Sequence, residues 1–216
     1  MNEGHHLTDE LAVAHAAGLL DEPLVLLVET HLAMSDEARA RHRSLEAVGG
    51  ALLDEIEPEA VGADVRDRVL AMLDVPPAIR IDAAAARCGK AVVPGPLARH
   101  IGSSFDGLKW RALGPVSEIR LLPQAEGYVT RLLKIKPGAS VPGHTHEGLE
   151  ATLVLQGSFS DHTGVFRRGD VAIAEGDLDH TPVAGEHEAC ICLAVTDAPL
   201  RLTGGFTRFL NPFVRI

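Results

Sequence analysis

The sequence lacks any long hydrophobic run. Over its 216 residues, no segment approaches the roughly 18 or more uncharged apolar residues that a membrane-spanning helix needs. The start of the chain, MNEGHHLTDE, is acidic and has neither the basic segment nor the apolar stretch of a secretory signal peptide. We therefore expect a cytoplasmic protein without membrane association.

Cysteine is also scarce, with three residues at Cys88, Cys190 and Cys192. This number is odd and too small for a disulfide framework, which agrees with a reducing compartment. Cys190 and Cys192 alternate with apolar residues, so both thiols share one face of a predicted strand. We interpret them as buried core residues, because a redox-sensing thiol needs exposure and a lowered pKa.

Positive charge is sparse in the amino-terminal part. Residues 1–94 hold 17 of the 30 acidic groups and 8 of the 20 lysines and arginines, a net charge of −9 out of −10 for the whole chain. Because nucleic-acid phosphates require positive charge, this distribution opposes direct nucleic-acid binding. It suits a basic protein partner, although a merely solvated helical surface would produce the same imbalance.

The first third has the periodicity of helices. Thr8 and Ser35 are candidate N-caps, and Ser35 is followed by acidic residues in the first turn. From 76 to 95 the chain is rich in Pro, Ala and Gly without an amphipathic pattern, which predicts a linker. The predicted helices cover residues 7–20, 23–34, 35–56 and 63–74.

After the linker the pattern changes to short strands separated by Gly, Pro or Asp, which is typical of an antiparallel barrel or sandwich. The change predicts two domains: a small helical bundle over 1–75 and an antiparallel β-barrel over 96–216, joined by residues 76–95. The predicted strands lie within residues 108–114, 116–122, 128–136, 151–159, 170–176, 190–196 and 200–205.

The segment GASVPGHTHEGLEATLVLQG, residues 138–157, predicts a metal site. On a strand, His144 and His146 project from the same face. Glu150 would lie about 13 Å further along an extended chain, so the chain must reverse around Glu147 and Gly148 to bring it back. His180, in GDLDHTPVA, is the leading candidate for a fourth ligand. Three imidazoles and a carboxylate suit Zn²⁺, Fe²⁺, Mn²⁺ or Ni²⁺; the alternative is a polar barrel mouth that binds no metal.

Residues 138–157 resemble the first motif of the cupin superfamily, in which Gly, His-x-His, Glu and Gly recur at this spacing. The segment GDVAIAEGDLDHTPVA resembles the second motif at Gly169 and His180. The resemblance implies a small cupin β-barrel whose metal is held by His144, His146, Glu150 and His180, with zinc as the expected ion.

Nearly the whole chain resembles the ChrR family of anti-sigma factors, in segments such as HHLTDELAVAHAAGLL, THLAMSDEARAR, LEATLVLQGSF and TDAPLR. In this family a helical zinc-binding anti-sigma domain precedes a cupin-like domain. The resemblance implies that residues 1–75 bind an extracytoplasmic-function sigma factor. It also implies that the barrel helps relieve inhibition under oxidative stress such as singlet oxygen.

The helical part departs from the family pattern at its zinc site. The family uses an amino-terminal histidine followed by His-x-x-x-Cys-x-x-Cys. Here His6 and His31 match the histidines, but Ser35 and Ala38 replace the cysteines. A serine hydroxyl is a poor zinc ligand and alanine is none, so His6 and His31 could form only a weak second metal site. The replacement is either natural or engineered.

Two functions from different classes fit these observations. In the first, the acidic helices bind a sigma factor and the metal-loaded barrel is a sensory or stabilising module, without catalysis. In the second, the barrel is a metal-dependent enzyme, for instance a dioxygenase, and the helices provide dimerisation. The helical segments and the charge distribution favour the regulator.

Overall fold

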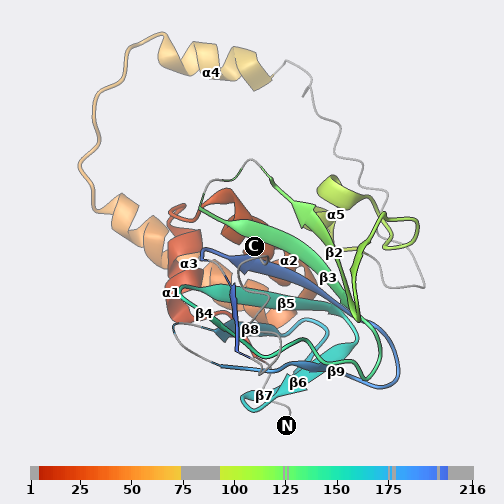
Figure 1. Cartoon of the computed structure of the whole chain (residues 1–216). Helices are drawn as coiled ribbons and strands as arrows, with labels where there is room; N and C mark the ends of the chain where they lie inside the picture. Colours follow the sequence, from red (N-terminus) through yellow and green to blue (C-terminus); the bar gives the residue numbers. More distant parts are fainter. Residues whose placement is uncertain are drawn as a thin grey trace.

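The computed structural model describes residues 5–73 and 93–203, apart from residues 124, 126, 175, 177, 178 and 199 and the side chains of His146 and Leu200. Figure 1 shows helices packed on one side of a large antiparallel sheet, with smaller sheets on its other side. The predicted fold class, amino-terminal helices followed by a cupin-like β structure, is confirmed. Among the described residues, no helix is long and apolar enough to cross a membrane.

The helices begin where the sequence supplies caps. Thr8 Oγ1 accepts a hydrogen bond from the Leu11 N–H at 3.4 Å, and Ser35 Oγ accepts one from the Ala38 N–H at 3.1 Å. Both predicted N-caps are therefore confirmed. The helices are α1 (Asp9–Ala16), α2 (Glu22–Met34), α3 (Asp36–Asp54), α4 (Val65–Leu73) and α5 (Gly95–Ile101), of which α5 was not predicted.

The strands form three antiparallel groups, a six-stranded sheet in the order β1-β2-β3-β10-β5-β8, a pair β11-β4 and a three-stranded sheet β7-β6-β9. The short strands β7 and β9 were not predicted, because too few residues alternate in them. The bounds are β1 (Arg111–Leu113), β2 (Val116–Leu121), β3 (Val129–Ile135), β4 (His144–His146), β5 (Glu150–Gln156), β6 (Ser158–Asp161), β7 (Gly164–Arg167), β8 (Val171–Ala174), β9 (Val183–Ala184), β10 (Cys190–Thr196) and β11 (Leu200–Leu202).

Strand β10 is the centre of the fold because both of its faces are covered, and all seven of its residues are buried. Leu193 and Val195 pack against the helices, whereas Cys192, Ala194 and Thr196 line a cavity on the opposite face. This explains its continuous apolar sequence, CICLAVT, which lacks the alternation of a strand with one solvated face.

One hydrophobic core joins the helices to the sheet. Leu27 and Val28 of α2 are completely buried, in the same cluster as Leu132, Leu153 and Leu193 of the sheet. At roughly 1.5–3 kcal/mol for each fully buried aliphatic side chain, α2 is held mainly by the β structure. The predicted boundaries at 75 and 96 stay predictions, since residues 74–92 lie outside the described residues.

The second half of α3 and the whole of α4 contribute little to this core. The buried residues of α3 are Ala38 and His42, both in its first half, and α4 has no buried residue. In Figure 1, α4 lies well away from the sheets. The apolar side chains of these segments are consequently left facing solvent.

Candidate metal centre

His144 and His180 are brought together by backbone pairing. The N–H of each donates to the carbonyl oxygen of the other at 3.1 Å, which forms an isolated antiparallel bridge. Directly opposed residues in such a pair carry their side chains on the same face. The two Nε2 atoms face each other at 3.0 Å, and both residues are buried. The structure therefore places His180, the predicted fourth ligand, beside His144.

Glu150, the first residue of β5, reaches the same point. Its Oε2 lies 3.5 Å from His180 Nε2 and 3.8 Å from His144 Nε2. The chain does reverse after β4, but β4 pairs with β11 and β5 pairs with β10 and β8. Gly148 is needed here because a Cβ at that position would overlap the Asp197 carboxylate, which accepts a hydrogen bond from the next backbone N–H.

Hydrogen bonds on the far side of each ring set the tautomers. His144 Nδ1 donates to the carbonyl oxygen of Pro142 at 2.7 Å, and His180 Nδ1 donates to Asp161 Oδ2 at 3.0 Å. Each neutral ring therefore keeps its Nε2 lone pair for the centre of the cluster. Two lone pairs that face each other at 3.0 Å require a proton or a cation between them.

Charges in this cluster favour a positive species. Burial lowers the pKa of His180, but the hydrogen bonds and charges of Glu150 and Asp161 outweigh burial and raise the pKa above 6.5. Burial raises the pKa of Asp161, but hydrogen bonds from Thr163 and His180 outweigh it, so the net pKa is lowered. The pair of carboxylates thus stabilises positive charge beside His180.

The donor set fits a divalent metal ion. The donor atoms of His144, Glu150 and His180 all lie within 4.8 Å of one another, and in the described part of the chain they form the one such group of three. Two nitrogens bound to zinc at about 2.0–2.1 Å lie about 3.4 Å apart in a tetrahedral site, close to the 3.0 Å seen here. The side chain of His146 lies outside the described structure, although its backbone belongs to β4 with that of His144.

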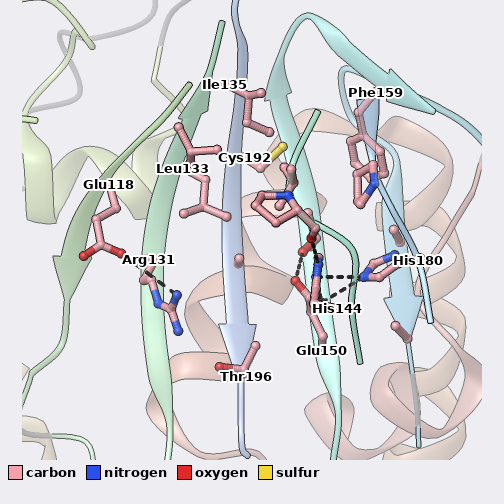
Figure 2. A pocket seen from close by; sticks show the side chains of 18 of the residues that line it. Glu118, Arg131, Leu133, Ile135, His144, Glu150, Phe159, His180, Cys192 and Thr196 are labelled. Atoms are coloured by element: carbon pink, nitrogen blue, oxygen red, sulfur yellow. Dashed lines mark hydrogen bonds and ion pairs between the residues drawn. The ribbon is translucent and has the colours of Figure 1, made fainter. Parts of the chain in front are cut away.

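The group formed by His144, Glu150 and His180, which we call the metal cluster although it is a set of side chains, opens into a cavity of about 430 Å³ between the large sheet and the smaller ones. Figure 2 shows Arg131 and Glu118 on the same cavity face as the metal cluster, with Leu133 and Ile135 further along β3. Asp161, Arg131 and Glu118 were not predicted from the sequence. The charge of the last two did not distinguish them, because β2 and β3 each carry a second charged residue, Arg120 and Lys134.

Comparisons with known proteins agree with this architecture. The family model described as ChrR Cupin-like domain matches residues 98–199. The anti-sigma-E factor ChrR of Cereibacter sphaeroides is 44% identical over 217 residues, which cover 98% of each chain. The chain belongs to the ChrR family of anti-sigma factors. The crystal structure of Rhodobacter sphaeroides SigE in complex with the anti-sigma ChrR aligns with a TM-score of 0.76 at 43% identity, over 89% of this chain and 98% of that chain.

Beside His6 and His31, where the family resemblance implied a weak second metal site, this chain has a small cavity of about 120 Å³. The rings of His6 and His31 lie 6.0 Å apart, and His6 Nε2 lies 3.5 Å from a Glu37 carboxylate that is 82% exposed. Ser35 Oγ is used as the N-cap of α3, and the buried Ala38 has no donor. Two imidazoles and a solvated carboxylate do not replace the missing thiolates, so the residues present do not fit a structural zinc ion.

His31 has another role in this member of the ChrR family. Its side chain is completely buried, and its Nδ1 donates to the carbonyl oxygen of Gly169, just before β8, at 2.9 Å. Its Nε2 is buried without a hydrogen-bond partner among the described residues. Burial lowers the pKa of His31, so the neutral ring is favoured. His31 therefore links α2 to the barrel through this hydrogen bond.

The two thiols of β10 have the environment of core residues. Cys190 and Cys192 are buried, and their sulfur atoms lie 3.5 Å apart. The hydrogen bond with Cys190 and burial raise the pKa of Cys192 well above its ordinary value, which opposes thiolate formation. The interpretation of these thiols as buried core residues is confirmed, and Cys88 lies outside the described residues.

Proposed function

We propose that this chain is an anti-sigma factor whose amino-terminal helices bind a sigma factor of the extracytoplasmic-function class. The relative named anti-sigma-E factor ChrR matches over nearly the full chain, and the solved ChrR structure is a complex with SigE. The chain's own structure supports the proposal through apolar side chains that are exposed among the described residues.

These exposed apolar side chains, which we call together the α3–α4 stripe, form two separate sets at helical spacing, one on each helix (Figure 1). Val48 and Leu52 of α3 are 59% and 61% exposed, one turn apart, and Ile56 continues the line. Leu70 and Leu73 are exposed in the same way on α4. Exposed apolar residues at helical spacing on amphipathic helices mark protein-binding surfaces, since helices bind partners by laying such a face into a groove. The full stripe comprises Val48, Leu52, Leu53, Ile56, Val69, Leu70, Met72 and Leu73.

The charge of the amino-terminal part favours a basic partner. Residues 1–94, which include both helices of the stripe, carry a net charge of −9, which would attract a basic partner and raise the association rate. A sigma factor carries the DNA-binding surfaces of the polymerase complex, so an acidic inhibitor that covers a basic surface would compete with nucleic acid.

For the barrel, we propose a resident metal ion, zinc, on His144, His146, Glu150 and His180. The converging Nε2 atoms, the fixed tautomers and the buried Glu150 carboxylate support this site. A divalent ion there would tie β4, β5 and residue 180 together and offset the carboxylate charge. We further propose that this module helps release the sigma factor under oxidative stress such as singlet oxygen.

A regulatory role accounts for more of the structure than a dioxygenase-like enzyme with a helical dimerisation domain. The regulator uses both the barrel and the α3–α4 stripe, whereas catalysis would use the barrel alone. We therefore expect no catalytic turnover, and we place the protein in the cytoplasm, where a sigma factor is available.

The test is to produce the full chain together with each extracytoplasmic-function sigma factor of its host and to measure complex formation and transcription. One sigma factor should co-elute at a one-to-one ratio and lose transcriptional activity in proportion to the inhibitor added. Absence of both effects with every such sigma factor would overturn the proposal.

A variant with charges in the stripe locates the interface. The double change Leu52→Asp and Leu70→Asp should weaken the complex at least tenfold, because hot spots of this kind contribute roughly 2 kcal/mol or more each. Val165→Asp is the matched control, since Val165 is 45% exposed on β7. An unchanged affinity in the double variant would place the interface elsewhere.

A further inference from the structure

The barrel cavity holds a charged group that the metal cluster does not explain. Arg131, in the middle of β3, is 8% exposed and points into the cavity (Figure 2). Its Nη1 lies 3.9 Å from Glu118 Oε2, beyond hydrogen-bond distance. Glu118 Oε1 instead accepts a hydrogen bond from Arg111 at 3.2 Å. Within the described ranges, no hydrogen bond from the Arg131 guanidinium is found, although it has five N–H donors to offer.

The sheet register places Arg131 at a fixed distance from the metal cluster. Arg131 lies opposite Ala194 of β10, and Ala194 lies opposite Thr152 of β5, two residues from Glu150. With strands about 4.8 Å apart, the β3 and β5 backbones are separated by roughly 10 Å. Between them the floor is the methyl group of Ala194, so the space over this strand is open to a ligand.

The remaining floor of the cavity is apolar. Along β3, Leu133 and Ile135 follow Arg131 on the same face, and Cys192 lies opposite Leu133. Phe159 of β6 lines the cavity as well. From Arg131 to Ile135 the strand rises about 13 Å, and an extended chain of about eight to ten carbons, which advances about 1.25 Å per bond, covers roughly 9–11 Å of that length.

The charge of the cavity selects an anion. The cavity lining includes three arginines and three acids, whose charges cancel. A divalent ion in the metal cluster would therefore make the total charge of the cavity positive. One guanidinium close to the Glu118 carboxylate suits a planar monoanion better than a dianion, which the carboxylate would repel. The lining groups counted are Arg111, Arg120, Arg131, Glu118, Glu150 and Asp161.

An entrance lies at the β1–β2 edge. Arg111 lines the cavity while its side chain is 69% exposed, and Leu113 lines it at 43% exposure. A ligand can therefore reach Arg131 from solvent without unfolding of the barrel. The cavity volume of about 430 Å³ is within the usual range for small-molecule sites.

We propose that the barrel binds a medium-chain aliphatic carboxylate, with the carboxylate on Arg131 and the chain along Leu133 and Ile135. This binding site is separate from the α3–α4 stripe, and it does not depend on the anti-sigma function. It gives the barrel a small-molecule input that the metal cluster alone would not provide.

The test is calorimetric titration of the full-length, zinc-loaded protein with octanoate and with 1-octanol, its uncharged counterpart. Octanoate should bind at least tenfold more tightly than octanol, because an Arg–carboxylate pair in a buried site adds a factor of roughly ten to a hundred. Equal affinities, or no binding of octanoate, would overturn the proposal.

Variants assign the carboxylate to Arg131. Arg131→Met should remove the preference for octanoate and leave octanol binding unchanged within about twofold, which also shows that the cavity is intact. Arg168→Met is the control, since Arg168 is exposed in the turn before β8. Octanoate affinity that survives Arg131→Met but is lost on metal removal would assign the carboxylate to the metal and refute the role of Arg131.

A conservative variant covers the case in which Arg131→Met does not fold. Arg131→Lys keeps the charge but not the bidentate geometry, so octanoate should bind several-fold more weakly than to the natural chain, with octanol unchanged. Unchanged octanoate affinity in Arg131→Lys would contradict bidentate recognition. No sigma factor takes part in these titrations, so their outcome is independent of the transcription test.

Discussion

His31 of α2 donates a hydrogen bond from Nδ1 to the carbonyl oxygen of Gly169 at 2.9 Å, across 138 positions of the chain. Two residues further on, the N–H of Val171 donates to the carbonyl oxygen of His5 at 2.9 Å. Val171 begins β8, and Ala174 of the same strand lies opposite Glu150. The metal cluster and the start of the helical part are therefore connected through one short strand.

Removal of the His31 side chain should destabilise the whole protein. His31→Ala deletes a completely buried ring and its hydrogen bond, so we expect a loss of about 2–4 kcal/mol in the free energy of unfolding. Urea unfolding followed by circular dichroism measures this loss. His100→Ala, at an exposed position on α5, should change it by less than about 0.5 kcal/mol. Equal stability of the two variants would refute the linking role of His31.

Metal retention should depend on the ligands and on the carboxylate behind His180. His144→Ala, His146→Ala and His180→Ala should each strip the barrel metal, as measured by elemental analysis after gel filtration. Asp161→Asn should weaken metal affinity roughly 10–100-fold, because it removes the partner that orients His180. His162→Ala, one residue away and exposed, is the control. Full metal retention in any ligand variant would remove that residue from the site.

Restoration of the two thiols should create a second metal site. The unmodified chain should bind one metal ion, and Ser35→Cys with Ala38→Cys should bind two, because the thiolates would complete the set begun by His6 and His31. With Co²⁺, the second ion should add thiolate charge-transfer absorption.

The matched control for this experiment is Ser44→Cys with Ala47→Cys, which has the same spacing on an exposed part of α3. It should bind no second ion. If the unmodified chain itself binds two ions, with the second lost in His6→Ala, then the conclusion that Ser35 and Ala38 abolish the site is wrong.

Stability of the helical part should fall as the pH falls below about 6.5. Burial and the nearby His42 ring lower the pKa of His15, against the opposing charges of Glu29 and Glu46. The folded state therefore binds fewer protons than the unfolded state just below pH 6.5, so this contribution is complete above that pH and is lost as the pH decreases.

His15→Gln should flatten this part of the profile, measured as urea midpoints between pH 7.5 and about 5. His100→Gln should leave the profile unchanged, since His100 is exposed. A profile that stays equally steep in His15→Gln would assign the dependence to other groups.

Much of the local structure could be predicted because it depends on neighbours in the chain. The N-caps at Thr8 and Ser35 use a side-chain oxygen and a backbone N–H three residues later, so sequence distance alone is informative. The His-x-His segment, Glu150 and His180 were predicted as one site from spacing, residue type and family resemblance. The structure brings His144, Glu150 and His180 together.

Other features depend on contacts that no local pattern encodes. The periodic apolar residues of α3 predict a buried face, yet Val48 and Leu52 are exposed, because periodicity does not say which partner covers a helix. Gly148 suggested a turn with relaxed backbone geometry, whereas its small size is required by Asp197, 49 positions later.

The sequence by itself indicated helices α1 to α4 with two of their caps, the change to strands, the family and a set of candidate metal ligands, because each of these depends on residue type and short-range spacing. Tertiary structure decided that α2 shares its core with the barrel, that His31 bonds to Gly169, and that Arg131 faces the same cavity as the metal cluster. These relationships are contacts between residues far apart in the chain, and such contacts form only when the whole chain packs.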